Sequence, residues 1–335
     1  MNSSYWLRRI FWVIPTLFGV ALIVFVLLRV VPGDPIAMLI PPGARTEDIA
    51  NLRALYGFDK PIWQQFILWL GAVAQGDFGN SISLRGNVLS LVLSRLPATL
   101  ELAFLAVTIA VTLGVLFATA SVYWRSRWPE KLADGFSGFA LGIPDFLWGL
   151  IFILVLGVLF PIMPISGRLD PSLEFDSYTQ FFLLESLLRG KFRIFASLLS
   201  HALLPALALA LPLAAMIARV LKNSLHEAMN QDYIMLARVK GFTQRRILWR
   251  EALRNALIPT VALTGVQFTF LIGGTVLIEY IYAYPGIGNM AIGAVIQRDL
   301  PLIQGLVLTF AVLFIAINFL IDASYRWLDP RVRQR

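Results

Sequence analysis

The chain has 335 residues, of which 58% are hydrophobic and 14% are charged, whereas about a quarter of the residues of a typical soluble protein are charged. With a mean hydropathy of +0.74 and apolar blocks long enough to cross a bilayer, this composition excludes one large soluble core and indicates a membrane protein. The absence of cysteine excludes disulfides, thiolate metal sites and cysteine nucleophiles. Having only two histidines argues against a histidine-rich metal site. Membrane topology explains the net charge of +8 better than nucleic-acid binding does.

Six segments have the apolarity and the length, about 20 residues, of a transmembrane helix. They are residues 10–31, 97–121, 136–160, 200–221, 259–282 and 302–325. The first follows Arg8 and Arg9 as a signal peptide would. However, its apolar run is too long, and Pro32-Gly-Asp-Pro35 replaces a small-residue cleavage site. We therefore predict an uncleaved signal anchor over residues 1–31, ahead of a five-helix core over residues 97–325.

The basic residues predict the orientation of these spans. If the N-terminus is cytoplasmic, the density of Lys and Arg is about threefold higher in the inner than in the outer segments. The inner segments are then 1–9, 122–134, 222–256 and 326–335, and the outer ones are 32–96, 161–199 and 283–301. We expect both termini to be cytoplasmic, with residues 326–335 as a C-terminal tail.

The outer segment 32–96 is patterned enough to be a small extracytoplasmic subdomain. Thr46 is a possible N-cap for a stretch that runs to Tyr56, and Ile62, Phe66 and Trp69 share one face of a further predicted helix. This second helix either lies in the membrane interface or packs within the subdomain itself. Both alternatives leave a large outer surface for a partner.

Few ionisable residues fall within the predicted spans, and most lie near span ends, where long side chains can reach headgroups or water. They are Arg29, Glu101, Asp145, Arg219, Glu279 and Asp322. Asp145, which follows Pro144, fits this explanation least well.

Helix-breaking or small residues occur within two of the spans. Pro205 and Pro212 in the fourth span, and Gly273 and Gly274 in the fifth, can loosen helices or permit close packing. They are candidates for helix packing or for a gate, although ordinary membrane bundles contain the same features.

A short polar stretch between the fourth and fifth spans has its own helix signals. Asp232 is a suitable N-cap and Gly241 is a suitable residue after a C-cap. The nine positions 232–240 therefore predict one short helix, with Arg238 and Lys240 favourably placed at its C-terminal end. A second helix is predicted from Thr243 towards Pro259. A helix this short is poorly suited to crossing a membrane or to catalysis, but it is well suited to being bound by another protein.

Several kinds of chemistry have no signature in this sequence. It contains no Walker A loop, no His-Glu-x-x-His helix and no Gly-x-Ser-x-Gly nucleophile elbow. Nothing resembles a proton or sodium relay at mid-span. Uphill transport would therefore need energy from an associated subunit.

The stretch Asp232-Tyr-Ile-Met-Leu-Ala-Arg-Val-Lys-Gly241, followed by Ala252-Leu-Arg-Asn-Ala-Leu-Ile-Pro259, resembles the cytoplasmic signature loop of bacterial ABC-importer permeases, most closely the dipeptide/oligopeptide/nickel branch. Further fragments extend the resemblance over nearly the whole chain. They are Arg8-Arg9, Ile14-Pro15-Thr16, Val31-Pro-Gly-Asp-Pro35, Gly57-Phe-Asp-Lys-Pro61, Gly76-Asp-Phe-Gly79, Leu96-Pro-Ala-Thr-Leu-Glu-Leu102, Pro164-Ile-Ser-Gly-Arg168, Tyr284-Pro-Gly-Ile-Gly288 and Asp329-Pro-Arg331. One departure is that Met235-Leu236-Ala237 stands where the wider superfamily has Glu-Ala-Ala.

The resemblance implies an all-α, polytopic chain of six transmembrane helices in the type I ABC-importer permease fold, in a bacterial inner membrane. It implies a pore-forming, non-enzymatic subunit that moves dipeptides, oligopeptides or related small polar solutes. The implied partners are a second permease subunit, two cytoplasmic ATPase subunits that bind ATP and Mg²⁺, and an extracytoplasmic solute-binding protein. This chain itself is expected to hold no cofactor, metal or nucleic acid.

In similar importers the short cytoplasmic helix docks into a cleft of the ATPase. Tyr233, Leu236, Ala237 and Lys240 share one face of the predicted helix and are the candidate contacts. That face could instead pack on the chain's own helix ends, as Ile234 and Met235 are equally able to do. Two other classes remain open: a stand-alone secondary transporter or channel, for which mid-membrane charges or paired broken helices would be needed, and a non-transporting membrane scaffold.

Overall fold

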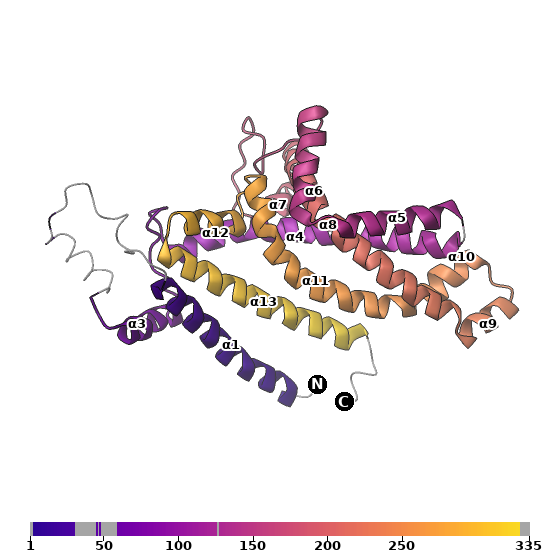
Figure 1. Ribbon diagram of the computed structural model, residues 1–335, viewed down its shortest axis with the longest axis horizontal. Coiled ribbons are helices and arrows are strands. Elements are labelled where there is room, and N and C mark those ends of the chain that lie inside the picture. The colour runs from indigo at the N-terminus through magenta and orange to yellow at the C-terminus, as the bar shows by residue number, and fades with distance from the viewer. Residues whose placement is uncertain (1–2, 31–44, 46, 48–58, 126, 329–335) are drawn as a thin grey trace. The chain divides into compact units, whose positions relative to one another are not determined.

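The computed structural model describes residues 3–30, 45, 47, 59–125 and 127–328 of the chain (Figure 1). This part is helical, apart from loops and one isolated antiparallel bridge between Asn80 and Asn87. The helices are α1 Ser3–Val30, α3 Ile62–Ala74, α4 Val88–Tyr123, α5 Trp128–Gly142, α6 Asp145–Phe152, α7 Phe182–Leu188, α8 Phe192–Met229, α9 Asp232–Val239, α10 Gln244–Arg246, α11 Leu253–Ile281, α12 Ile287–Ile296 and α13 Leu300–Leu328. Two π-helical segments, η1 Ile153–Leu159 and η2 Ile247–Ala252, continue α6 and precede α11.

The predicted all-α, polytopic fold is confirmed. Within the described residues, α1, α4, α8, α10–α11 and α13 are long and apolar enough to cross a membrane. The pair formed by α5 and α6–η1 makes a sixth span if it is counted as one. The stretch predicted to begin at Thr46, and the tail beyond Leu328, lie outside the described residues.

The third predicted span, residues 136–160, is not one straight helix. α5 ends at Gly142, α6 begins at Asp145, and the two are bent by 102° (Figure 1). Ile143 is extended, with φ −115° and ψ 123°, because a residue before proline is driven out of the helical region. Pro144 then becomes the N-cap of α6. The prediction of an uninterrupted helix is wrong at this point.

Other prolines do not break their helices. Pro205 and Pro212 lie inside α8, and Pro259 lies inside α11. α8 packs against α5, α6, α7 and α11, and this burial stabilises it as one helix through both prolines. The helix that was predicted to run from Thr243 towards Pro259 therefore continues to Ile281.

The chain consists of two compact units: residues 1–96 with 290–316, and residues 97–289 with 317–335. In the first unit, α3 packs on α1 through Phe66 and Trp69, whose ring centroids lie 5.2 and 5.6 Å from that of Phe25. Trp63 and Ile67 on α3 stay exposed. The helix predicted at this position thus exists, and it packs on α1 while part of its apolar surface stays exposed.

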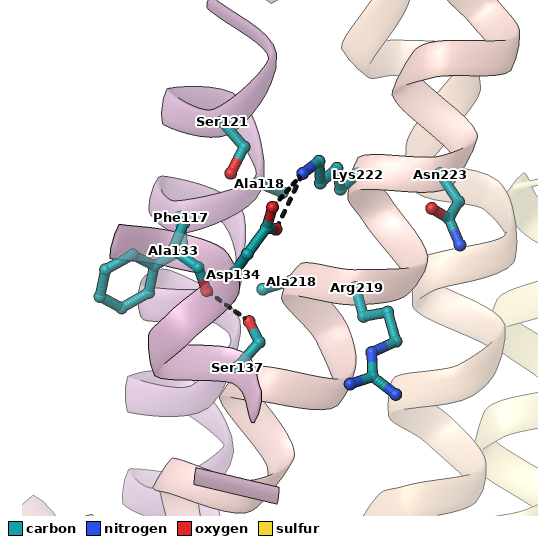
Figure 2. A pocket seen from close by; sticks show the side chains of 10 residues that line it. All are labelled: Phe117, Ala118, Ser121, Ala133, Asp134, Ser137, Ala218, Arg219, Lys222 and Asn223. Carbon is teal, nitrogen blue, oxygen red and sulfur yellow. Dashed lines mark hydrogen bonds and ion pairs between the residues drawn. The ribbon is translucent and has the colours of Figure 1, made fainter. Parts of the chain in front are cut away.

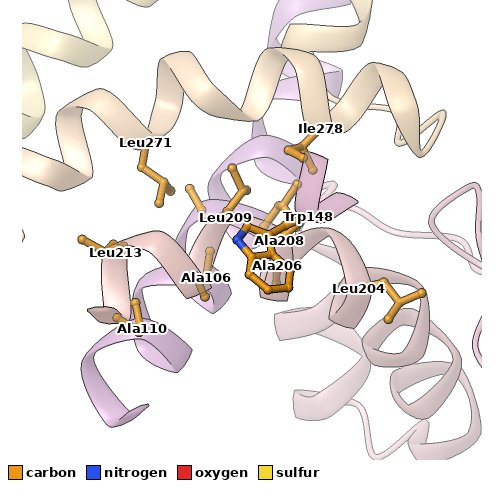
Figure 3. Packing of buried hydrophobic residues seen from close by; sticks show 14 of the residues in the cluster. Ala106, Ala110, Trp148, Leu204, Ala206, Ala208, Leu209, Leu213, Leu271 and Ile278 are labelled. Carbon is orange, nitrogen blue, oxygen red and sulfur yellow. The ribbon is translucent and has the colours of Figure 1, made fainter. Parts of the chain in front are cut away.

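The core of the second unit is built largely from alanine and leucine. Trp148 of the bend packs among small side chains of α4 and α8, including Ala106 and Ala208, with Ile278 of α11 nearby (Figure 3). Small residues allow helix backbones to approach closely in a membrane bundle. At Gly114 of α4 the approach is close enough that an added Cβ would lie 2.5 Å from a methyl carbon of Ile217.

Candidate functional site

The short helix predicted at residues 232–240 is present as α9, but its first cap differs from the prediction. Gln231 is the N-cap and makes no side-chain capping hydrogen bond, while Asp232 is the first helical residue. Asp232 is therefore not the N-cap. In the first turn its carboxylate still complements the helix dipole, as Arg238 does in the last turn.

The C-terminal end of α9 has the predicted glycine stop. Gly241 adopts φ +75°, which is the left-handed region that favours glycine. Its N–H donates to the carbonyl of Arg238 at 2.9 Å, and the N–H of Phe242 donates to the carbonyl of Ala237 at 3.1 Å. These two bonds form a Schellman motif, so the helix ends sharply after Lys240.

One side of α9 is anchored in the second unit. Ile234 is fully buried and Ala237 is 5% exposed, and both join an apolar cluster with Leu221 and Leu225 of α8 and Leu248 of η2. Ala237 was predicted to be a docking contact. This prediction is wrong, because the side chain of Ala237 faces the chain's own core. Ile234 behaves in the same way.

The opposite side of α9 is an exposed apolar surface, which we call the α9 face: Tyr233, Met235, Leu236, Val239 and Lys240. Tyr233 is 38% exposed, Leu236 54% and Val239 79%. The predicted docking contacts included Tyr233, Leu236 and Lys240 but neither Met235 nor Val239. The three-residue spacing from Leu236 could have identified Val239. Exposed apolar patches of this kind mark surfaces that interact with another protein or with a membrane.

The segment that follows α9 holds it in place. The Thr243 hydroxyl accepts from the N–H of Arg246 at 3.4 Å, so Thr243 is the N-cap of α10, where the second helix was predicted to begin. The Arg246 guanidinium lies 3.7 Å from the ring centroid of Phe242. Ile247 and Leu248 then enter the apolar cluster beneath α9.

A cavity of about 210 Å³ lies between the α5–α6 bend, α8 and α11, and we call it the bend pocket. Its lining includes Asp145, Pro212 and Gly274. The other two candidates for packing or gating lie elsewhere: Pro205 is buried in the core, and a Cβ added at Gly273 would meet nothing within 4 Å. The structure thus brings together two of the four candidates.

A second, polar pocket of about 260 Å³ lies among α4, α5 and α8 (Figure 2). Its Lys222 ammonium binds both carboxylate oxygens of Asp134 at 2.8 Å and the Glu130 carboxylate at 2.9 Å. Arg219 lies one turn away on the same helix (Figure 2). Because these charges are paired with one another, we interpret the pocket as a polar contact that joins α5 to α8.

Two glutamates expected to reach headgroups or water are instead buried. Glu101 is 9% and Glu279 0% exposed, and the Glu101 carboxylate accepts from the Arg168 guanidinium at 2.8 Å. The hydroxyl of Thr99 donates to the Glu279 carboxylate at 2.6 Å, and the N–H of Gly288 donates at 2.8 Å. The bond between Thr99 and Glu279 joins residues that are 180 apart in the sequence.

Among the described residues, no group of three or more His, Cys, Asp or Glu side chains could hold a metal ion.

Comparison with known proteins identifies the family to which this chain belongs. Residues 110–334 match the family model of the binding-protein-dependent transport system inner membrane component, and residues 3–103 match the model of its N-terminal region. The chain is 36% identical over 334 residues to the di/tripeptide transport system permease protein DppB of Pseudomonas aeruginosa, with 99% of each chain covered. It is 34% identical to the dipeptide permease DppB of Escherichia coli K12, with 98% of each covered. It is 32% identical to the glutathione transport system permease protein GsiC of Salmonella paratyphi A, with 99% of each covered.

Two solved structures share the fold. One is the crystal structure of an amino acid ABC transporter with histidines, with a TM-score of 0.51 and 17% identity, over 71% of this chain and 94% of that one. The other is an inward-facing MetNI methionine ABC transporter, with a TM-score of 0.53 and 16% identity, over 72% and 97% of the two chains. At these identities the likeness concerns the type I permease fold alone.

Proposed function

The chain belongs to the binding-protein-dependent transport system inner membrane component family, and we propose that it is the permease subunit of an ATP-driven importer of short peptides. The family, the full-length relatives and the helical bundle make it a multi-pass translocation subunit of the inner membrane. What we propose beyond this is the solute, the partners and the source of energy.

The observation that carries the coupling proposal is α9. It is a capped helix whose buried side is tied into α8 and η2, and whose opposite side exposes the α9 face. A rigid helix transmits a displacement that a flexible loop would absorb. We propose that a cytoplasmic ATPase subunit grips the α9 face, so that both termini lie in the cytoplasm, as the distribution of basic residues favours.

The other partners follow from the same assembly. We propose a second permease subunit that completes the pore, a second ATPase subunit, and an extracytoplasmic binding protein that delivers the solute. ATP and Mg²⁺ are bound by the ATPases. The relatives named for di- and tripeptides, dipeptides and glutathione support a peptide of two or three residues as the solute.

The experiment is to purify the tagged full-length chain from its own membranes and identify the proteins that accompany it. The complex is then reconstituted in vesicles, with uptake of labelled dialanine and ATP hydrolysis measured together. We expect two ATPase subunits and a second permease in the complex, and hydrolysis that rises with the peptide-loaded binding protein. A chain that purifies alone and conducts solute without ATP would refute the proposal.

Two variants test α9 in the same assay. Gly241→Val forces a β-branched residue into the left-handed region and removes the Schellman stop, so uptake per ATP hydrolysed should fall while membrane insertion is retained. Gly241→Asn is the matched control, because asparagine tolerates this region. Equal uptake by well-expressed Gly241→Val would refute the role of α9.

A further inference from the structure

The bend pocket contains a carboxylate, that of Asp145, which has no part in the proposed coupling through α9. Asp145 begins α6 at the point where the third span breaks, and it faces α8 and α11 across the cavity. The only hydrogen bond that its side chain accepts among the described residues comes from the neighbouring N–H of Phe146, at 2.8 Å. None of the ion pairs in that part of the chain includes Asp145.

An ionisable side chain within a membrane bundle is costly and is usually paired or placed in a polar pathway. The buried Glu101 and Glu279 of this unit follow that rule, since Glu101 meets Arg168 and Glu279 receives a hydroxyl and two backbone N–H groups. Asp145 is only partly buried and differs because it lines an open cavity, in which the other polar side chain is that of Gln267. Phe270, which also lines the cavity, is 67% exposed, so the pocket opens to the surface of the chain.

Gly274 keeps the carboxylate accessible. A Cβ at this position would lie 2.9 Å from the Asp145 carboxylate oxygen Oδ2. Any larger residue would therefore push into the carboxylate or fill the space in front of it.

We propose that the bend pocket receives the α-ammonium group of the transported peptide, with Asp145 as its counter-ion. This inference rests on the proposed function. A cavity of about 210 Å³ is smaller than the roughly 300–1,000 Å³ of pockets that enclose a whole ligand, so it accommodates the amino-terminal end of a peptide. The apolar neighbours Met216 and Phe270 would contact the first side chain.

The first test uses the reconstituted complex and the variant Asp145→Asn. Asparagine keeps an oxygen that can accept from the N–H of Phe146, so the start of α6 is preserved while the charge is removed. We expect uptake of dialanine to fall about tenfold or more, corresponding to the loss of one charge-assisted bond. The control is Asp134→Asn, which removes a carboxylate of the same span outside the bend pocket, and we expect its uptake to stay within about twofold.

The second test does not depend on transport. The chain has no cysteine, so Met216→Cys places its single thiol in the bend pocket. In the complete complex, a cationic methanethiosulfonate reagent should label this thiol faster than an anionic one, and Asp145→Asn should reduce that preference. Dialanine should slow the labelling, whereas N-acetyl-dialanine should not.

The outcomes separate the two proposals. If the unmodified complex takes up no peptide, the proposed function fails. If it takes up peptide, and Asp145→Asn changes neither the uptake nor the charge preference of the thiol, the function stands and the counter-ion role of Asp145 is refuted. Equal protection by dialanine and its acetylated form would also refute the role, because the site would then not recognise the ammonium group.

Discussion

The buried pair Glu101–Arg168 gives the sharpest prediction about stability. The Arg168 guanidinium donates to the Glu101 carboxylate at 2.8 Å and to the Gln180 carbonyl at 2.9 Å, and it lies 4.1 Å from the ring centroid of Phe182. The two side chains are 7% and 8% exposed. Neither charge can therefore be hydrated if its partner is removed.

The expected magnitude follows from this burial. Among the described residues, Arg168→Met leaves the Glu101 carboxylate with only the N–H of Leu184, at 3.1 Å. Breaking a buried pair from one side costs about 3–5 kcal/mol. Glu101→Gln should cost a similar amount, because it strands the guanidinium. The double variant carries no stranded charge, so its loss should be smaller than the sum of the single losses by about 2–3 kcal/mol.

The assay is reversible unfolding of the four proteins of this cycle in detergent micelles, with the free energy of unfolding as the quantity compared. Asp134→Asn provides the control, because that side chain is 57% exposed in its pair with Lys222. We expect it to cost less than about 1 kcal/mol. Additive effects in the cycle, or an Arg168→Met variant as stable as the control, would show that the pair does not stabilise this region.

Three further predictions concern a pH window, a helix contact and the base of α9. Hydrogen bonding, first from Ser177 and then from backbone N–H groups, lowers the pKa of Glu185 from 4.5 to about 2. Its contribution to stability should therefore be complete above pH 4.5 and lost as the pH falls towards 2, and Glu185→Gln should remove this pH dependence from hydrogen exchange at residues 178–179. Gly114→Ala should cost about 1–3 kcal/mol of unfolding free energy by overpacking against Ile217, whereas Gly138→Ala, whose Cβ would meet nothing within 4 Å, should cost nothing; equal effects would contradict the close contact. Ile234→Ala should destabilise α9 by about 2–5 kcal/mol and speed its hydrogen exchange, while the exposed Met235→Ala should change stability by less than about 0.5 kcal/mol; identical exchange in the two variants would contradict the anchoring role of Ile234.

The sequence predicted α9 well because its signals are local. The stop at Gly241 depends on the backbone preference of one residue, and the structure shows it at φ +75°. The burial of Ala237 was not predictable in the same way, because no local signal shows which side of the helix faces the chain's own core. Which side faces inward is decided by Leu221 and Leu248, which belong to other helices.

The bend at Pro144 shows a limit of local rules. The same restriction applies before every proline, yet the helices continue through Pro205, Pro212 and Pro259. What differs is the packing of the surrounding helices, which the chain order does not reveal. The pairing of Glu101 with Arg168 is also non-local, since 67 residues separate the two, and position near a span end wrongly indicated exposure to water.

The two candidate sites are mechanically connected within the second unit. α8 contributes Met216 to the bend pocket and Leu225 to the cluster beneath α9, a separation of about 14 Å along one continuous helix at 1.5 Å per residue. η2 and α11 make a second connection, from Leu248 under α9 to Gln267 in the pocket. Coupling between distant sites needs packed elements that move as units, and both connections are helical. We therefore expect a force applied to the α9 face to reach the α5–α6 bend, where Asp145 lies, through α8 and α11.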